Sequence, residues 1–380
     1  MDAVSVDASR IATVPTRRLD APGGENMTSR GRYWTGFLIA GAAGAACVAP
    51  VARAQSSVTL YGIADVFAGS VKNPGGRAAI VQQGGGMTTS FWGIGGTEDL
   101  GGGNKAFFVL ESYFQPQSGA YGRYAGDSLF SRNAYVGLQT RFGQLRFGRI
   151  TTPLYLATIQ FNPLFNSYTF SPMIFHTFKG VGAEGVVGDS AWNNAVAYTS
   201  PTFGGFNAGL LYALGNAAGR NGAKKWSVNA NYTHGAFAAA AIFQYVNFSA
   251  TPGDLGGALA AAPGLSSQRT VQVDASYDWR VVKLFAQYMN VANRAPSGNF
   301  HGDTLQAGVS VPIGVGSLLA SCAYTHSSGA AADGEHRSTG ALGYDFPLSK
   351  RTDIYAAIKV DRVGGLSTGV TSGAGLRTRF

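Results

Sequence analysis

Short stretches in which polar and apolar residues alternate recur along most of this chain, and they predict β-strands. In 270–279 the odd positions are Val, Val, Ala, Tyr and Trp, while the even positions from 272 to 278 are Gln, Asp, Ser and Asp. The segment 226–233 repeats this pattern with Trp, Val, Ala and Tyr against Ser, Asn, Asn and Thr. A helix would scatter those polar residues around its circumference, so the period of two favours strands with one polar and one apolar face.

The same pattern predicts sixteen strands, separated by connections that alternate between short and long. The expected strands are 58–68, 88–97, 104–114, 131–139, 143–150, 191–199, 205–213, 225–234, 237–247, 270–279, 281–291, 302–311, 316–326, 337–345, 352–361 and 370–380. The short connections contain two to five residues, or the single Arg280, whereas long ones include 69–87, 115–130, 151–190 and 248–269. We therefore predict an all-β fold, a 16-stranded antiparallel transmembrane barrel with short periplasmic turns and long extracellular loops. Sixteen strands enclose a lumen too wide for side chains to fill, hence an aqueous channel.

The composition agrees with a barrel and excludes a helical membrane protein. Only 13% of the 380 residues are charged, while 54 are Gly and 12% are aromatic. No stretch of about 18 apolar residues occurs after residue 55, so no spanning helix is expected there.

The N-terminal region reads as an export signal preceded by an extension. Residues 1–26 resemble no targeting element, so we expect translation to start at Met27. Residues 27–54 combine basic residues, an Ala- and Gly-rich apolar core and a small-x-small ending at Ala54, which predicts cleavage before Gln55. A short membrane anchor or a lipoprotein site at Cys47 fits less well. The mature domain would then be 55–380.

The mature chain is basic and has one cysteine. Residues 55–380 contain 23 Lys and Arg against 16 Asp and Glu, a net charge of +7. A basic balance can indicate nucleic-acid binding, but in an exported barrel it favours attraction of anions through a channel. Because only Cys322 remains, no internal disulfide can form, and stability is expected from the closed sheet.

The chain ends in Gly-Leu-Arg-Thr-Arg-Phe, with an aromatic residue as its last residue. Leu376 and Phe380 belong to the apolar positions of the last predicted strand. We interpret this ending as the strand that closes the barrel and presents it to the assembly machinery of the outer membrane.

Several segments together resemble the general (trimeric) porins of Gram-negative outer membranes, over essentially all of 55–380. They are Ser-Val-Thr-Leu-Tyr-Gly at 57–62, Gly-Thr-Glu-Asp-Leu-Gly at 96–101, Leu-Phe-Ser-Arg-Asn-Ala-Tyr-Val-Gly-Leu at 129–138, Phe-Gly-Arg at 147–149, Tyr-Thr-Ser-Pro at 198–201 and the C-terminal ending. The resemblance implies a channel for passive diffusion of small hydrophilic solutes and ions. It also implies a homotrimer, contact with outer-membrane lipid and lipopolysaccharide, and no cofactor or nucleic-acid partner.

In that family the third loop folds into the barrel and narrows the channel, with acidic loop residues facing arginines of the wall. Here the corresponding loop, 151–190, has forty residues, and its only acids are Glu184 and Asp189. Basic residues usual on the wall are also replaced, with Phe91, Gly95, Ala191 and Trp192 at or beside those positions. The expected constriction residues are Arg132, Arg149, Tyr155, Phe161, Phe165, Tyr168, Phe170, Phe175 and Lys179.

Two interpretations of the aromatic loop remain open. Its aromatic residues can be anchors that pack the loop against the wall. Alternatively, they line a constriction that is less charged than usual and favours small aromatic or weakly anionic solutes, with Arg132 and Arg149 giving a mild anion preference. The resemblance leaves the trimer contacts open, because the face to which Ala134 and Gly137 point is ambiguous.

Other chemistry is weakly supported. The five histidines show no ligand spacing, so no metal site is expected. Ser321 and His326 lie on one predicted strand, but they do not make a hydrolase, and the glycine triplets at 84–86 and 101–103 do not open phosphate-binding helices. A surface adhesin or receptor is the remaining alternative, although the Gly- and Ala-rich loops offer few aromatic anchors.

Overall fold

The computed structural model describes residues 57–178, 185–186, 188–216, 224–247, 265–296, 298–330 and 336–380. The expected signal segment with Ala54 and Gln55, and also Lys179 and Glu184, lie outside these residues. In the described part of the chain, no helix is both long and apolar enough to cross a bilayer.

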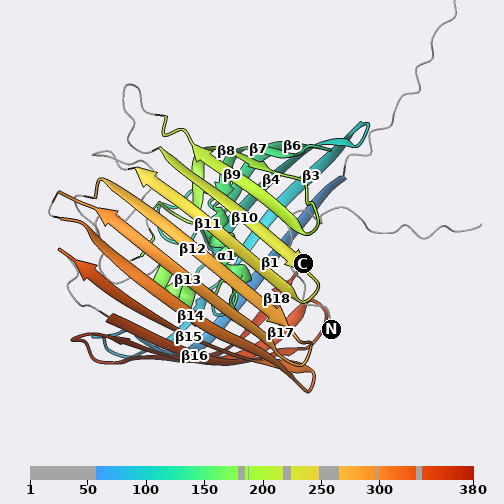
Figure 1. The fold of residues 1–380 in the computed structure, drawn as a ribbon. Coiled ribbons are helices and arrows are strands. Elements are labelled where there is room, and N and C mark those ends of the chain that lie inside the picture. Colours follow the sequence, from blue (N-terminus) through green and yellow to red (C-terminus); the bar gives the residue numbers. More distant parts are fainter. Residues whose placement is uncertain are drawn as a thin grey trace, which may run out of the picture. The chain divides into compact units, whose positions relative to one another are not determined.

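Sixteen long strands form a closed antiparallel barrel, and each predicted strand is found at its expected place (Figure 1). They are β1 (Ser57–Lys72), β3 (Phe91–Gly101), β4 (Asn104–Gln115), β6 (Asn133–Thr140), β7 (Gly143–Thr151), β8 (Ala191–Thr199), β9 (Phe206–Ala213), β10 (Lys225–His234), β11 (Phe237–Asn247), β12 (Ser267–Asp278), β13 (Lys283–Arg294), β14 (Phe300–Ile313), β15 (Gly316–Gly329), β16 (His336–Pro347), β17 (Thr352–Val363) and β18 (Gly369–Arg379).

Pairing of β1 with β18 closes the barrel, from Ile63 opposite Arg379 to Lys72 opposite Val370. The last residue takes part: the Phe380 amide donates to the Gly62 carbonyl, and the Gly62 amide donates to the Phe380 carbonyl, both at 3.1 Å. Each of the sixteen described wall strands therefore pairs on both sides, which a spanning sheet requires in lipid.

The expected loops contain additional structure. The first predicted loop, 69–87, is shorter than expected because β1 continues to Lys72 and β2 (Ala79–Gly84) pairs with it. The second loop contains the two-residue strand β5 (Ala120–Tyr121). The third loop contains the helices α1 (Pro153–Gln160) and α2 (Pro172–Phe178). Local alternation could not show these elements, because each depends on contacts with the barrel.

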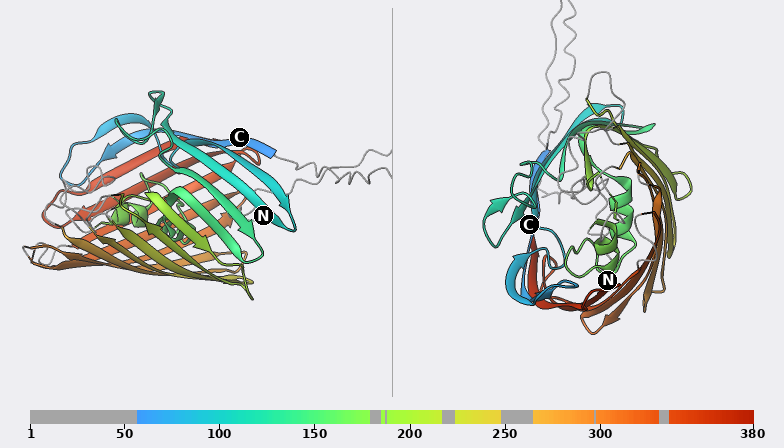
Figure 2. Two further views of the ribbon diagram at one scale, coloured as in Figure 1. Left: turned by 90° about the horizontal axis from the view of Figure 1, so that it is seen from above. Right: turned by 90° about the vertical axis from the view of Figure 1, so that its left-hand side faces the viewer.

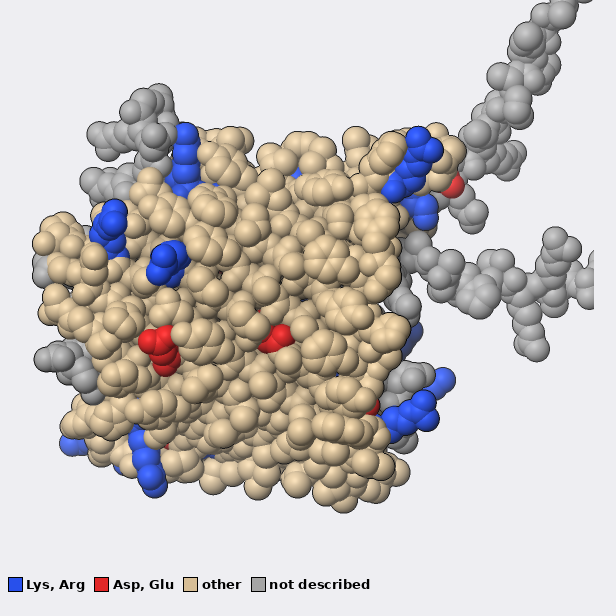
Figure 3. Space-filling view, viewed as in Figure 1, with Lys and Arg blue, Asp and Glu red and all other residues tan. Residues whose placement is uncertain are grey.

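The two faces of the wall follow the predicted alternation. On β12, Gln272 and Asp274 are buried inside the barrel, whereas Val273 and Tyr277 are exposed outside. Figure 3 shows that the outer face over these strands is largely uncharged, with Lys and Arg mostly near the ends of the strands. This distribution suits a wall whose outer surface contacts lipid.

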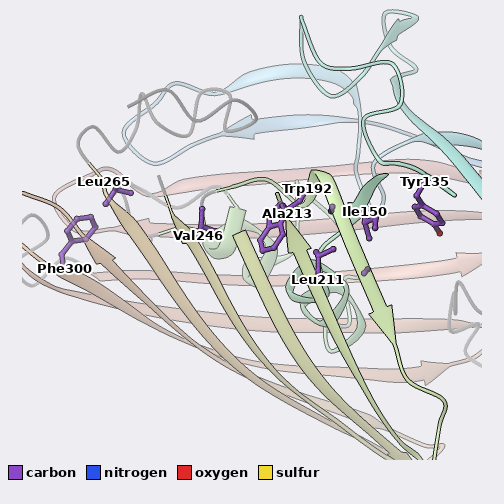
Figure 4. Packing of buried hydrophobic residues seen from close by; sticks show 10 residues of the cluster. Tyr135, Ile150, Trp192, Leu211, Ala213, Val246, Leu265 and Phe300 are labelled. Carbon is purple, nitrogen blue, oxygen red and sulfur yellow. The ribbon is translucent and has the colours of Figure 1, made fainter. Parts of the chain in front are cut away.

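The inner wall also has apolar residues, which the alternation did not predict. One buried cluster extends from β6 through the following strands to β14 (Figure 4), and its larger members are Tyr135, Ile150, Trp192, Leu211, Val246, Leu265 and Phe300. Two further inner-wall clusters receive the third loop.

Candidate channel constriction

The third loop lies inside the barrel, where α1 and α2 stand against one side of the wall (Figure 2, right). Helix α1 begins after Thr152, whose Oγ1 accepts a hydrogen bond from the Tyr155 amide at 3.2 Å. Pro153 follows at the first helical position, which suits its fixed φ angle and missing amide hydrogen. The local sequence therefore sets where the chain turns inward from the end of β7.

Apolar side chains dock α1 on the inner surface of β11 and β13. Leu154, Phe161 and Met173 from the loop are at most 1% exposed, and they pack with Ile242 and Met289 of the wall. Fully burying a side chain of this size contributes about 2 kcal/mol. Several such residues therefore hold α1 and the start of α2 on the wall.

A second apolar cluster docks the middle of the loop on another part of the wall. Leu164 and Phe170 pack against Phe67 of β1 and Tyr355 of β17. The rings of Phe67 and Phe170 meet edge to face, with centroids 5.5 Å apart. The loop is consequently fixed at two separate places on the wall.

Polar contacts fix the same region through Asp65 of β1. Its carboxylate accepts hydrogen bonds from the Met87 and Thr88 amides at 3.0 and 2.9 Å and from the Tyr355 hydroxyl at 2.6 Å. The chain at 85–88 is thereby held in place, and its Gly85 carbonyl accepts from the Thr169 hydroxyl at 2.9 Å. A buried acid, inaccessible to water, thus positions a segment that holds the loop.

Helix α2 covers two cations of the wall. The Phe175 ring lies 3.2 Å from Lys359 Nζ and 4.7 Å from the Arg337 guanidinium carbon. The neighbouring His176 contacts the Thr325 and Thr339 hydroxyls at 2.6 and 2.7 Å. Burial and the positive charge of Arg337 lower the pKa of His176 to about 3, so this imidazole is neutral at physiological pH.

The expected aromatic residues of the loop divide into two groups. Phe161, Phe170 and Phe175 are buried against the wall, where they act as anchors. Tyr155 is buried against the Tyr168 and Phe178 rings of the loop itself. Phe165 is 48% exposed within the barrel, and Tyr168 is partly exposed. The interpretation as anchors therefore applies to the buried residues, and the interpretation as constriction lining applies to Phe165 and Tyr168.

The accessible surface of the loop is mostly apolar. Leu156 is 42% exposed, Gln160 is exposed, and Ile159 is partly exposed, in addition to Phe165 and Tyr168. Residues 152–178 contain no Asp, Glu, Lys or Arg. This part of the loop consequently presents neither an acidic nor a basic charge.

Arg132 meets the wall acid Glu111 and an aromatic ring. Its guanidinium forms an ion pair with the Glu111 carboxylate and stacks 4.2 Å above the Phe91 ring. Tyr61 donates a further hydrogen bond to Glu111 at 2.8 Å. Sequence analysis identified Arg132 but not this acid, which lies on a different strand.

Arg149 belongs to an arginine–aspartate junction between the second and third loops, formed by Arg123, Asp127, Arg149 and Asp189. Asp189 pairs with Arg123 at 2.6 Å and with Arg149 at 2.7 Å, while Arg123 also pairs with Asp127 at 2.8 Å. Burial alone would raise the pKa of Asp189, but the two guanidinium groups outweigh it and lower this pKa to about 2. Arg123 was not anticipated, because nothing in its local sequence shows that its loop reaches Asp189.

Arg146 is the second arginine of β7, beside Arg149, and sequence analysis also missed it. It pairs across the sheet with Gly137 and Ala197, and its Nη2 donates to the Thr199 hydroxyl at 3.2 Å. Its guanidinium carbon lies 5.7 Å from the Tyr135 ring on the inner wall. Within the described ranges, no carboxylate forms an ion pair with Arg146. This arginine differs from Arg132 and Arg149, whose charges are each opposed by an acid.

Comparison with known proteins gives the family. A model of the Gram-negative porins matches residues 40–366. Outer membrane porin protein 32 of Delftia acidovorans is 33% identical over 80% of this chain and 83% of its own length. An outer membrane porin protein of Bordetella pertussis is 30% identical over 84% of this chain and 91% of its own length. The solved anion-selective porin from Comamonas acidovorans superposes with a TM-score of 0.72 at 27% identity, covering 86% of this chain and all of that one. The chain therefore belongs to the Gram-negative porins and is an outer-membrane channel protein, with no catalytic activity implied by its family.

Proposed function

We propose that this porin passes small hydrophilic solutes with a mild preference for anions and for weakly charged aromatic molecules. The main support is the loop surface of 152–178, which contains no charged residue where acids would repel anions. Arg146 adds a cationic side chain that no described carboxylate neutralises. The likeness to an anion-selective porin agrees with this direction.

The ion pairs explain why we expect the preference to be mild. Arg132 with Glu111, and Arg123 and Arg149 with Asp127 and Asp189, are groups in which positive and negative charges balance. Balanced pairs produce a local field across the channel, but they change the mean potential less than an unopposed charge does.

Reversal potentials in planar bilayers test this proposal. The wild-type channel should favour Cl⁻ over K⁺, and Arg146→Gln should reduce that preference by roughly threefold, because one unopposed charge is lost. Arg269→Gln is the matched control, since this exposed arginine lies on the outer side of β12. Cation selectivity of the wild type, or equal effects of both variants, would contradict the proposal.

We further propose that the chain assembles as a homotrimer and is exported with removal of residues 1–54. One small residue of the early strands, Gly137, faces inward, where a Cβ would lie 2.3 Å from the Phe107 ring, while Val136 and Leu138 are exposed outside. Exposed apolar residues on β1 and β6 provide a surface for contact between barrels. Stepwise conductance in triplets would support the trimer, and the mass of the purified protein would test a start at Gln55.

A further inference from the structure

Asp274 of β12 is a buried acid without a cationic side chain beside it. Its side chain is 1% exposed and faces the interior of the barrel. Both of its carboxylate oxygens accept a hydrogen bond from Gln272 Nε2, at 3.0 Å each. Within the described residues, no Lys, Arg or His forms an ion pair with this carboxylate. Because an uncompensated charge away from water is costly, the site calls for a proton or a cation.

Two buried amide oxygens lie in the same row of the inner wall. The sheet register places Gln287 directly opposite Asp274, and Gln306 directly opposite Gln287. These glutamines are 2% and 4% exposed, and their Nε2 atoms donate to the Thr158 carbonyl and the Ser321 hydroxyl, both at 3.0 Å. Within the described part of the chain, the Oε1 atom of each glutamine has no hydrogen-bond donor. The row therefore combines a carboxylate with two amide oxygens that can accept a further contact.

Helix α1 borders this row at its C-terminal turn. The Thr158 hydroxyl donates to Gln272 Oε1 at 3.2 Å, and the Thr158 carbonyl accepts from Gln287. Since α1 ends at Gln160, the carbonyl end of the helix, with its partial negative charge, lies beside the row. Wall and helix thus bring oxygen acceptors together at one place, and both favour a positive charge there.

A cation matches this set of atoms better than a proton does. A protonated Asp274 offers one O–H donor, which satisfies one acceptor and leaves an amide oxygen unmatched. A hard cation instead binds several oxygens at once, and carboxylate and amide oxygens are the ligands that it prefers. One carboxylate among neutral oxygens balances a single positive charge, whereas calcium sites gain affinity from several carboxylates.

We propose that Asp274, Gln287 and Gln306 bind an alkali cation, K⁺ or Na⁺, which joins the wall strands β12–β14 to α1. The cation neutralises the buried carboxylate and contacts both amide oxygens. It therefore strengthens docking of the third loop at the end of α1. Because the three side chains are buried, the site lies outside the solute path, so the inference is independent of the channel's ion preference.

Anomalous diffraction from crystals soaked in thallium(I) acetate tests the proposal, because Tl⁺ replaces K⁺ at oxygen sites and scatters strongly. In the wild type we expect a peak in contact with the Asp274 carboxylate and the two amide oxygens. Asp274→Asn keeps the shape of the side chain and should lower the occupancy of this peak about tenfold at a subsaturating Tl⁺ concentration. Asp303→Asn, which removes an acid of the outer wall, is the matched control and should leave the peak unchanged. Absence of the wild-type peak, as expected for a protonated Asp274, or an undiminished peak in Asp274→Asn would overturn the site.

Cleavage of the third loop by protease gives an independent measurement in solution. In KCl, wild-type cleavage should be about fivefold slower than in N-methyl-D-glucamine chloride of the same ionic strength, because the organic cation is too large for the site. Asp274→Asn and Gln306→Leu should lose this difference, while Asp303→Asn should retain it. The heat-dependent gel mobility of the barrel verifies that each variant is folded. Equal cleavage of the wild type in the two salts would refute the link between the cation and the loop.

Discussion

Neutralising Asp189 should make the channel more anion-selective. The substitution Asp189→Asn keeps the size of the side chain but removes the negative charge that now lies between Arg123 and Arg149. Arg123 would then keep Asp127 as its acidic partner, while Arg149 would lose the carboxylate with which it pairs. Because Asp189 belongs to a loop, the sixteen paired strands should remain intact.

Two energies describe the effect of Asp189: the stabilisation of the loop contact and the interaction of its charge with a passing ion. The pKa of Asp189 falls from 3.8 to about 2, which corresponds to about 2 kcal/mol of stabilisation of the loop contact. For an ion passing at about 5 Å, a unit charge in water is worth roughly 0.8 kcal/mol, reduced to about 0.5 kcal/mol by screening in 0.1 M salt. Loss of the Asp189 charge stabilises a passing anion and destabilises a passing cation by this energy, so the ratio of anion to cation permeability changes roughly fivefold.

Reversal potentials across a KCl gradient measure this ratio. Asp303→Asn is the matched control, since it changes the net charge equally but lies on the outer wall near Tyr288 and Asn290. The effect of Asp189→Asn should shrink in about 1 M salt, where the Debye length falls to about 3 Å. An unchanged ratio at low salt, or an equal change in the control, would refute the placement of Asp189 beside the ion path.

Three further predictions concern the loop, the terminus and pH. Phe161→Ala should weaken docking of the third loop by about 3 kcal/mol, because it empties a fully buried site. Protease cleavage within the loop should become faster, while the heat stability of the barrel changes little. Unchanged cleavage would contradict the anchoring role of Phe161. Phe380→Ala should lower the yield of inserted barrels but leave the conductance of each inserted channel unchanged, because the aromatic ring packs near Gly62 at the closure; outer-membrane yield and single-channel recordings measure the two effects. The difference in selectivity between wild type and Asp189→Asn should persist down to about pH 4 and vanish as the pH falls through about 2. The reason is that the lowered pKa keeps the Asp189 carboxylate charged, and its contacts with the arginines complete, above the ordinary pKa of an aspartate, and this effect is lost below the shifted pKa. Loss of the difference near pH 6 would exclude Asp189 as the group responsible.

The channel-facing residues were harder to predict than the strands. Arg149 was expected on the wall, but the register shift between Gly148 and Ile150 interrupts the alternation there. Arg146, two residues from that irregularity, follows the regular pattern and faces inward. A bulge changes the direction of a side chain without a clear signal in the local sequence.

The roles of the loop aromatics also depended on docking. Phe161 and Phe165 are both aromatic and only four residues apart, yet the first is buried against Met289 and the second is exposed within the barrel. Because both faces of this loop are apolar, sequence periodicity gave no basis for choosing between anchor and channel surface.

The sequence by itself determined the sixteen strands, the alternation of short and long connections and the closing strand that ends at Phe380. These features depend on a period of two and on turn length, which are local properties of the chain. Tertiary structure alone decided which charges meet, since Asp189 joins arginines that are 66 and 40 residues away. It also decided which residues of separate strands lie side by side on the outer wall, such as Ala307, Cys322 and Gly340. Contacts between distant segments follow from closure of the whole barrel, so no window of the sequence contains them.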